Sequence, residues 1–256
     1  FRPVSHYFRQ NFSQVTNPPI DSLRENKVMS LKTRFGNLGN ILDFDNLTEE
    51  NIYVLDSPVL TNSQFKKFKK FFSKKTKEID CTFDITSSLK DRIEAIREEA
   101  ETSVREGSTC IVLTDKYINN YKASIPSILT VGAVHSHLVK QGLRGYCSLN
   151  VECSDALDTH SFAVLIGVGA TTVNPYLAID SIYQRFEKKL FGKSDFESCV
   201  VKFKKSIDSG LLKIISKMGI SVISSYRGGC NFETVGISRT IVKDYFPGML
   251  SKISGI

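Results

Sequence analysis

The sequence predicts an α/β fold made of repeated parallel βα units. The first observation is that short apolar, β-rich segments alternate four times with longer amphipathic segments between residues 79 and 190. The second is their spacing of about 30 residues, the length of a strand, a crossover helix and their loops. Four units are half of a TIM-barrel-like (β/α)8 fold or a small doubly wound sheet. A closed barrel, a partial barrel and an open sheet all fit this pattern.

Capping and turn residues bound these predicted elements. Ser87 or Ser88 can cap the first helix, and Gly107 closes it. Pro126 lies near the first turn of the second helix, and Gly142 lies at its end. The predicted strands are 79–83, 109–115, 147–153 and 171–176, and the predicted helices are 87–107, 125–142, 156–167 and 178–190.

The repeated units occupy the middle of three regions. Residues 1–78 form a lead-in that ends in a basic helix, residues 79–190 contain the βα units, and residues 191–256 form C-terminal helices. The segments predicted in the last region are a long helix at 195–219, a strand and turn at 219–229, and a short helix that starts near Ser238.

The composition is that of an ordinary globular protein that needs no metal or disulfide staple. The chain has 256 residues, 41% hydrophobic residues and a net charge of +7, and a chain of this length buries most of its unfolded surface. Its six cysteines include no C-x-x-C pair, which favours free thiols in a reducing, cytoplasmic setting. No apolar run approaches the roughly 20 residues of a membrane span, so no membrane partner is expected. The chain does not begin with methionine, so we expect it to be part of a longer polypeptide.

Positive charge is concentrated at residues 66–78, which read KKFKKFFSKKTKE. One interpretation is a surface for nucleic acid or another polyanion. Phenylalanines recur here at spacings of three and four, which predicts a helix with a buried aromatic face and its lysines in solvent. No nucleic-acid motif accompanies the lysines, so we expect no nucleic-acid partner. The phenylalanines are Phe65, Phe68, Phe71 and Phe72.

Polar residues lie where the predicted strands end. Parallel α/β folds gather functional groups at the carboxyl ends of their strands. Such residues could build a polar site from four loops, or they could cap the helices that follow. Both interpretations remain open, and helix capping is the commoner use. The residues are Asp84, Asp115, Glu152 and Asn174.

Two apparent motifs do not predict a site. His135 and His137 are two residues apart, so a helix turns them to different faces and they cannot easily share a metal. The GVGATT segment at 167–172 precedes a strand, whereas a dinucleotide-binding loop follows one. We therefore expect packing histidines and a helix-to-strand turn.

Arg227 lies in the segment SYRGG, beside two glycines. A guanidinium and the backbone amides of a glycine turn can grip a phosphate or a carboxylate. A turn with a surface arginine fits the segment equally well. Arg227 is therefore a candidate for an anion or interface contact.

Six segments, which span nearly the whole chain, match the sequence motifs of one known family. They are HYFRQNFSQVTNPPIDSLRE (6–25), LDSPVLTN (55–62), IPSILTVGAVHSHLVKQGLR (125–144), NPYLAID (174–180), GLLKIISKMGIS (210–221) and SYRGG with FETVGISR (225–239). In this order they resemble the central domain of the glutamate synthase large subunit.

The resemblance implies one part of an enzyme that converts glutamine and 2-oxoglutarate into two glutamates. In that family a glutaminase domain releases ammonia, which travels through a tunnel to an FMN-binding barrel, and an iron–sulfur cluster relays electrons. The central domain resembles this barrel, links the two active sites and holds no cofactor. The implied partners are the glutaminase and FMN-binding domains of the same polypeptide. The electron donor is either a small NADPH-oxidising subunit or ferredoxin, and the sequence leaves both alternatives open. No catalytic, cofactor-binding or metal-binding residue is expected in this chain.

Thr16 and Asn17 precede two consecutive prolines, Pro18 and Pro19. The prolines fix φ at two positions and bias the preceding residue toward an extended conformation. Interpreted through the resemblance, Thr16 and Asn17 line the ammonia tunnel, whose wall must keep a fixed shape. A rigid joint between domains without tunnel contact also explains the prolines.

The chain departs from the family in several places. Gly229 and Cys230 stand where the family usually has alanine and glutamine. The sequence also contains neither the N-terminal cysteine of a glutaminase nor a cluster-binding cysteine triplet, so the isolated chain is expected to be inactive. The alternative function is a free-standing α/β enzyme that binds a flavin or small molecule through Asp84, Asp115, Glu152 and Arg227.

Overall fold

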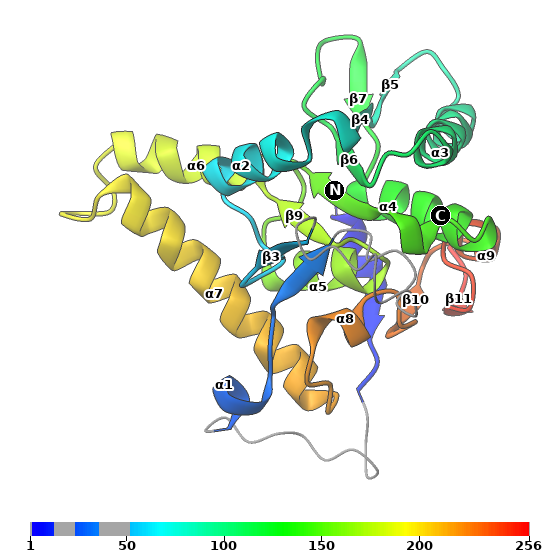
Figure 1. Ribbon diagram of the computed structural model, residues 1–256. Helices are drawn as coiled ribbons and strands as arrows, with labels where there is room; N and C mark the ends of the chain where they lie inside the picture. The colour runs from blue at the N-terminus through cyan, green and yellow to red at the C-terminus, as the bar shows by residue number, and fades with distance from the viewer. Residues whose placement is uncertain (1, 13–23, 36–51, 256) are drawn as a thin grey trace, which may run out of the picture.

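The computed structural model describes residues 2–12, 24–35 and 52–255, and its central element is a four-stranded parallel sheet (Figure 1). Each strand pairs with the next one along the chain. This order is that of a segment of a TIM barrel, whereas a doubly wound sheet reverses its order at a switch point. The predicted α/β class is therefore confirmed, and the described strands form a partial barrel. The strands are β4 (Thr76–Asp80), β6 (Cys110–Thr114), β8 (Ser148–Glu152) and β9 (Thr172–Asn174).

A helix follows each strand, as predicted. Ser88 caps the first helix, since its hydroxyl accepts a hydrogen bond from the backbone N–H of Asp91. Gly107 and Gly142 follow two of the helices with φ values of 98° and 71°, a conformation that residues with side chains rarely adopt. The helices are α3 (Leu89–Arg105), α4 (Ser127–Lys140), α5 (Thr159–Gly167) and α6 (Tyr176–Glu187).

The two faces of the sheet are buried in different apolar clusters. Ile111 and Leu113 of β6 lie in the main core, together with residues of α3, α4 and α5. Their neighbours Cys110 and Val112 alternate to the other face and join a second cluster. Burial on both faces explains why β6 is a continuous apolar run in the sequence.

The second cluster is built mainly by α2 (Asn62–Phe72) and its phenylalanines. Three of the four phenylalanines predicted to be buried are buried, whereas Phe71 is 49% exposed. The prediction of a helix through residue 78 is wrong, because the chain leaves α2 through a single turn, η4 (Ser73–Lys75), and enters β4 at Thr76. The lysine-rich composition of this segment does not indicate a strand, although β4 pairs with buried β6.

The strand predicted at 79–83 is wrong as a single element, because two strands of different sheets meet there. The parallel strand β4 ends at Asp80, and after Cys81 the chain continues as β5 (Thr82–Asp84). β5 pairs antiparallel with β7 (Lys122–Ser124), which the sequence did not predict. Both halves are extended, so the apolar pattern alone does not reveal the break.

The C-terminal region forms a three-stranded sheet with the beginning of the chain. β10 (Phe232–Val235) pairs antiparallel with β1 (Phe8–Gln10) and parallel with β11 (Leu250–Ile253). Phe8 and Phe232 contact each other edge to face across this sheet, with ring centroids 6.3 Å apart.

The strand and turn predicted at 219–229 is wrong, because the segment contains the short helix α8 (Ile223–Tyr226). Tyr226 is fully buried, and its hydroxyl donates a hydrogen bond to the side chain of Gln10. This contact between distant parts of the chain outweighs the local preference for strand.

The remaining elements are short or connect the units above. The long helix α7 approaches α5 closely, since a Cβ atom at Gly210 would lie 2.5 Å from Cγ2 of Thr159. Among the described helices, none is long and apolar enough to cross a bilayer. These elements are η1 (Val4–Tyr7), α1 (Glu25–Val28), β2 (Thr33–Phe35), β3 (Tyr53–Leu55), η5 (Arg144–Tyr146), α7 (Phe196–Lys217) and α9 (Arg239–Tyr245).

Candidate functional site

The carboxyl edge of the parallel sheet brings together three of the four polar residues singled out in the sequence. Register pairs Thr114 with Glu152, and Glu152 with Asn174, on neighbouring strands. Asp115 follows Thr114 directly, and Asp80, which ends β4, pairs with Thr114. The edge therefore carries three carboxylates and one amide, all supplied by strand ends or the residues just after them.

Asp84 does not belong to this edge. It ends β5 rather than a parallel strand, and its side chain is exposed. Its carboxylate accepts hydrogen bonds from the backbone N–H of Thr86, at 2.8 Å, and from the Thr86 hydroxyl, at 2.6 Å. These bonds hold the pKa of Asp84 below its usual value, so this residue stabilises a turn.

Glu152 is buried, and both oxygens of its carboxylate have partners. Its carboxylate accepts a hydrogen bond of 2.9 Å from the Thr114 hydroxyl and forms an ion pair with Nζ of Lys116 at 2.5 Å. The Lys116 ammonium also lies 5.1 Å from the ring centroid of Tyr176. Lys116 thus neutralises Glu152 and ties the loop after β6 to β8.

Asp115 is the other buried carboxylate of the edge. One of its oxygens, Oδ2, accepts hydrogen bonds from the backbone N–H and the hydroxyl of Ser154, at 3.0 and 2.6 Å. Tyr176 also hydrogen-bonds to Asp115. Burial and the negative charge of Asp115 raise the pKa of Tyr176, so the phenol stays protonated and serves as a donor.

A cavity of about 10 Å³ lies behind this edge. Its volume is that of one water-sized molecule, and it is far below the roughly 300 Å³ at which pockets for organic ligands begin. This cavity therefore has room for one small polar molecule. The residues around it are Cys81, Leu113, Thr114, Asp115, Ser127, Thr130, Val151 and Glu152.

Asp155 extends the polar cluster toward α4. Its Oδ2 accepts a hydrogen bond of 3.0 Å from the backbone N–H of Ser127, at the start of that helix. Burial raises the pKa of Asp155. The other oxygen of Asp155 and Oδ1 of Asp115 are buried without a hydrogen-bond partner.

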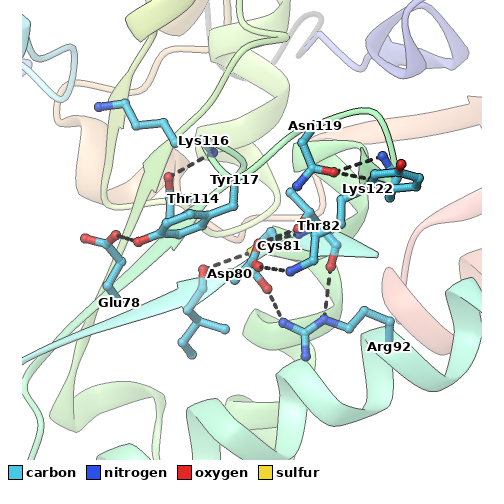
Figure 2. Close-up of polar contacts among 12 residues, drawn as sticks. Glu78, Asp80, Cys81, Thr82, Arg92, Thr114, Lys116, Tyr117, Asn119 and Lys122 are labelled. Atoms are coloured by element: carbon cyan, nitrogen blue, oxygen red, sulfur yellow. Dashed lines mark hydrogen bonds and ion pairs between the residues drawn. The ribbon is translucent and has the colours of Figure 1, made fainter. Parts of the chain in front are cut away.

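The outer half of the edge is a network of polar contacts around the turn from β4 to β5 (Figure 2). Asp80 accepts hydrogen bonds from the backbone and the hydroxyl of Thr82, at 2.8 and 2.7 Å. Arg92 of α3 donates to the carbonyl oxygens of Asp80 and Thr82. On the other side, Glu78 accepts a hydrogen bond of 2.7 Å from the hydroxyl of Tyr117 (Figure 2). These contacts fix the loop between β6 and β7 against the first strand.

Asn174 completes the edge on the side of α2. Its amide nitrogen donates hydrogen bonds of 3.0 Å to the carbonyl of Leu60 and to the side-chain oxygen of Asn62. It therefore anchors the beginning of α2 to β9, which is a structural role.

Arg227 lies at the other end of the sheet. It shares a cavity with Thr109 and Thr171, which precede β6 and β9. Asp115 follows the end of β6 and Glu152 ends β8, both at the opposite edge of the sheet, so Arg227 does not join them in one site. The residues proposed for a free-standing flavin or small-molecule enzyme therefore do not converge in the structure.

The two histidines have separate packing roles, as expected. Nε2 of His137 lies 2.6 Å from a carboxylate oxygen of Glu101, while Nδ1 of His135 accepts a hydrogen bond of 3.1 Å from Nε of Arg144. The segment 167–172 joins α5 to β9 and is a helix-to-strand turn, as predicted. No group of three or more metal-ligating side chains is arranged around a common point within the described residues.

Thr16 and Asn17 lie outside the described residues, so their assignment to a tunnel wall stays a prediction. Within the described part, several important residues were missed: Asp80, Lys116, Ser154, Asp155 and Tyr176. Asp80 could have been found by ending the first strand one residue after buried Ile79. The others are recognisable only through partners on neighbouring loops, which no local pattern specifies.

Comparison with known proteins places these observations in a family. Residues 1–238 match a family model described as the glutamate synthase central domain. Over 259 aligned residues the chain is 55% identical to the glutamate synthase [NADPH] large chain of Azospirillum brasilense, covering 100% of this chain and 17% of that protein. It is 40% identical to the chloroplastic ferredoxin-dependent glutamate synthase of Spinacia oleracea, covering 98% of this chain and 16% of that protein. The chain thus spans about a sixth of the length of these relatives.

Solved structures show a weaker likeness. The flavin-binding domain of baker's yeast flavocytochrome b2 is 14% identical, with a TM-score of 0.44 over 74% of this chain and 44% of that one. A likeness at this level says nothing about ligands.

Proposed function

Because this chain belongs to the glutamate synthase central domain family, we propose that it links the glutaminase and FMN-binding domains of a glutamate synthase large subunit and lines the ammonia path between them. The whole enzyme converts glutamine and 2-oxoglutarate into two glutamates. The observation that carries this proposal is the match of the entire chain, at 55% identity, to 17% of a glutamate synthase large chain.

The carboxyl edge of the sheet supports a linking role. Glu152 is neutralised by Lys116, and Asp115 is held by Ser154 and Tyr176. Carboxylates that bind partners within their own domain are poorer candidates for proton transfer to a substrate than free ones, although Oδ1 of Asp115 has no hydrogen-bond partner. Held in this way, they form a stiff frame on which neighbouring domains can be oriented.

In this proposal the cofactors belong to other parts of the polypeptide. FMN and an iron–sulfur cluster are bound outside this chain, and a small NADPH-oxidising subunit delivers electrons. The NADPH donor is favoured because identity to the NADPH-named relative is 55%, against 40% for a ferredoxin-dependent one. A reducing, cytoplasmic location accords with the six cysteines, all of them free thiols.

Thr16 and Asn17 are the proposed tunnel residues. Ammonia is small and neutral, so its path needs a constant width and few competing hydrogen-bond acceptors. The double proline that follows fixes the backbone and suits such a wall.

The test is a bulky substitution, Thr16→Phe or Asn17→Leu, in the complete enzyme. We expect glutamine hydrolysis to continue while glutamate formed per glutamine consumed falls by about tenfold, because a blocked path releases ammonia to solvent. Added ammonium should restore glutamate synthesis, and Thr16→Ser, which preserves size and the hydroxyl, should remain coupled. Unchanged coupling in both bulky variants would refute the assignment of the wall, and so would a variant that added ammonium cannot rescue.

A further inference from the structure

A cavity at the amino end of the sheet is lined by three arginines. Arg34 comes from β2, Arg144 from η5 and Arg227 from the residue after α8, and they surround a volume of about 190 Å³. Among the described residues that line it, none is an aspartate or glutamate. The other lining residues are Phe35, Thr109, Gly145, Tyr146, Cys147, Ser148 and Thr171.

Arg144 is held in place by uncharged acceptors. Its guanidinium donates to the carbonyl oxygens of Cys147 and Gly169, at 2.6 and 2.9 Å, and to Nδ1 of His135, at 3.1 Å. His135 contributes no charge, because burial and the two nearby arginines, Arg144 and Arg227, lower its pKa to about 4. The positive charge of Arg144 is thus fixed beside the cavity without an acidic partner among the described residues.

Arg227 is less satisfied. Its Nε is buried and has no hydrogen-bond partner, and within the described part of the chain no carboxylate forms an ion pair with it. Burial and the charge of Arg144 lower the pKa of Arg227 to about 10, so it remains protonated at neutral pH. Buried charges are normally paired, since burying an isolated charge costs several kcal/mol. A counter-ion would remove this cost.

We propose that this cavity binds a small oxyanion of the phosphate or carboxylate class, held by Arg227 and Arg34 and flanked by the fixed charge of Arg144. A guanidinium donates two parallel hydrogen bonds to such an anion, and the Thr109 hydroxyl lines the same cavity. The volume accommodates phosphate or a short dicarboxylate and is too small for a nucleotide coenzyme. The site lies at the end of the sheet opposite to Asp115 and Glu152, and the proposal uses neither of the residues assigned to the tunnel wall.

The test is a titration of the full 256-residue chain with inorganic phosphate and, separately, with succinate. Sodium chloride keeps the ionic strength constant, because the net charge of +7 makes any salt a weak stabiliser. Calorimetry and the thermal unfolding midpoint report binding, since a ligand that binds the folded state raises that midpoint. We expect a saturable response to at least one titrant, and the tighter of the two identifies the class of anion.

Arg227→Gln should weaken the binding by about tenfold or more, because it removes a charged donor. Arg34→Gln, at the exposed rim, should weaken it by a few-fold. The matched control is Arg185→Gln on the exposed surface of α6, which changes the net charge equally and should leave the titration unchanged.

A second measurement separates binding from a structural role of Arg227. Without anion, Arg227→Gln should unfold at the same temperature as the parent chain or a higher one, since it removes an unpaired buried charge. A variant that is destabilised equally with and without anion would show that Arg227 serves packing alone. The absence of a saturable response to both phosphate and succinate in the parent chain would equally overturn the proposal.

Discussion

The two ends of the parallel sheet bury charge in opposite ways. At the carboxyl end the negative charge of Glu152 is matched by Lys116, 2.5 Å away. At the amino end Arg144 and Arg227 lie beside one cavity, and within the described residues no carboxylate forms an ion pair with either of them. The carboxyl end therefore contains an internally compensated ion pair beside the buried carboxyl groups of Asp115 and Asp155, whereas the amino end carries arginines without a carboxylate partner among the described residues.

This difference indicates where each end directs its interactions. The ion pair of Glu152 and Lys116, whose charges cancel, stabilises its own loops and needs no further ion. A cluster with excess buried charge destabilises the fold unless something else supplies the opposite sign. The comparison thus favours a structural role for the carboxyl end and ligand binding for the amino end.

The largest loss of stability is expected from a substitution of Gly169 at the amino end, whose carbonyl accepts a hydrogen bond from Arg144. A Cβ atom at Gly169 would lie 2.3 Å from Cγ of His135, and φ is +128°. Gly169→Ala should lower the free energy of unfolding by about 4 kcal/mol, from overpacking together with backbone strain. Urea unfolding measures the change.

The control for this substitution is Gly107→Ala. Gly107 also has a positive φ, of 98°, but a Cβ atom at this position would have no neighbouring atom within 4 Å. The substitution should cost about 1 kcal/mol from the backbone conformation alone. Equal costs at the two glycines would mean that the contact between Gly169 and His135 does not constrain this end of the sheet.

The positive charge at the amino end can also be detected through the pH dependence of stability. Burial and the charges of Arg144 and Arg227 lower the pKa of His135 from 6.5 to about 4 in the folded state. In this pH range His135 binds a proton in the unfolded chain but not in the folded chain. The free energy of unfolding therefore decreases as the pH falls from about 6.5 toward 4. We expect a loss of roughly 3 kcal/mol over this window.

Comparison with His135→Gln isolates this contribution, because carboxylates that titrate at low pH are common to both proteins. The difference in the free energy of unfolding between parent and variant should shift by that amount between pH 7 and pH 4. A constant difference across this range would mean that burial and the two arginines do not lower the pKa of His135.

Much of the fold could be predicted from the sequence, because its signals are local. The helix that begins after Ser88 and the buried strand β6 follow from capping and apolar patterns within a few residues. The break at Cys81 could not be predicted in this way, since β5 ends the parallel strand by pairing with β7, about 40 residues later in the chain. Helix α8 was missed for the same reason, because Tyr226 is fixed by Gln10.

The candidate sites were predictable to a smaller degree. Asp115, Glu152 and Asn174 could be placed at one edge, because the carboxyl ends of parallel strands align. Their partners could not be identified, since Lys116 and Tyr176 reach across from different loops. Arg227 was recognised as an anion-binding candidate, but its two neighbouring arginines come from segments far away in the sequence.

The ion pair between Glu152 and Lys116 at the carboxyl end can be removed by substituting Lys116, with a smaller expected effect on the free energy of unfolding. Lys116→Met leaves Glu152, whose side chain is 5% exposed, without its ionic partner. Removing one member of a buried pair costs about 3–5 kcal/mol, but Lys116 is 44% exposed and is partly screened by solvent. We therefore expect a loss of about 2 kcal/mol in urea unfolding, between the values for buried and surface pairs.

The double variant Lys116→Met with Glu152→Gln decides whether this loss comes from the charge. If the uncompensated carboxylate is the cause, neutralising it should recover most of the stability, because Gln can still accept the hydrogen bond from Thr114. Lys67→Met, on the exposed face of α2, is the matched control and should be nearly neutral. If the double variant were no more stable than Lys116→Met, the contact of the Lys116 ammonium with the Tyr176 ring would be its main contribution. The contrast between the two ends of the sheet would then have to rest on the arginines alone.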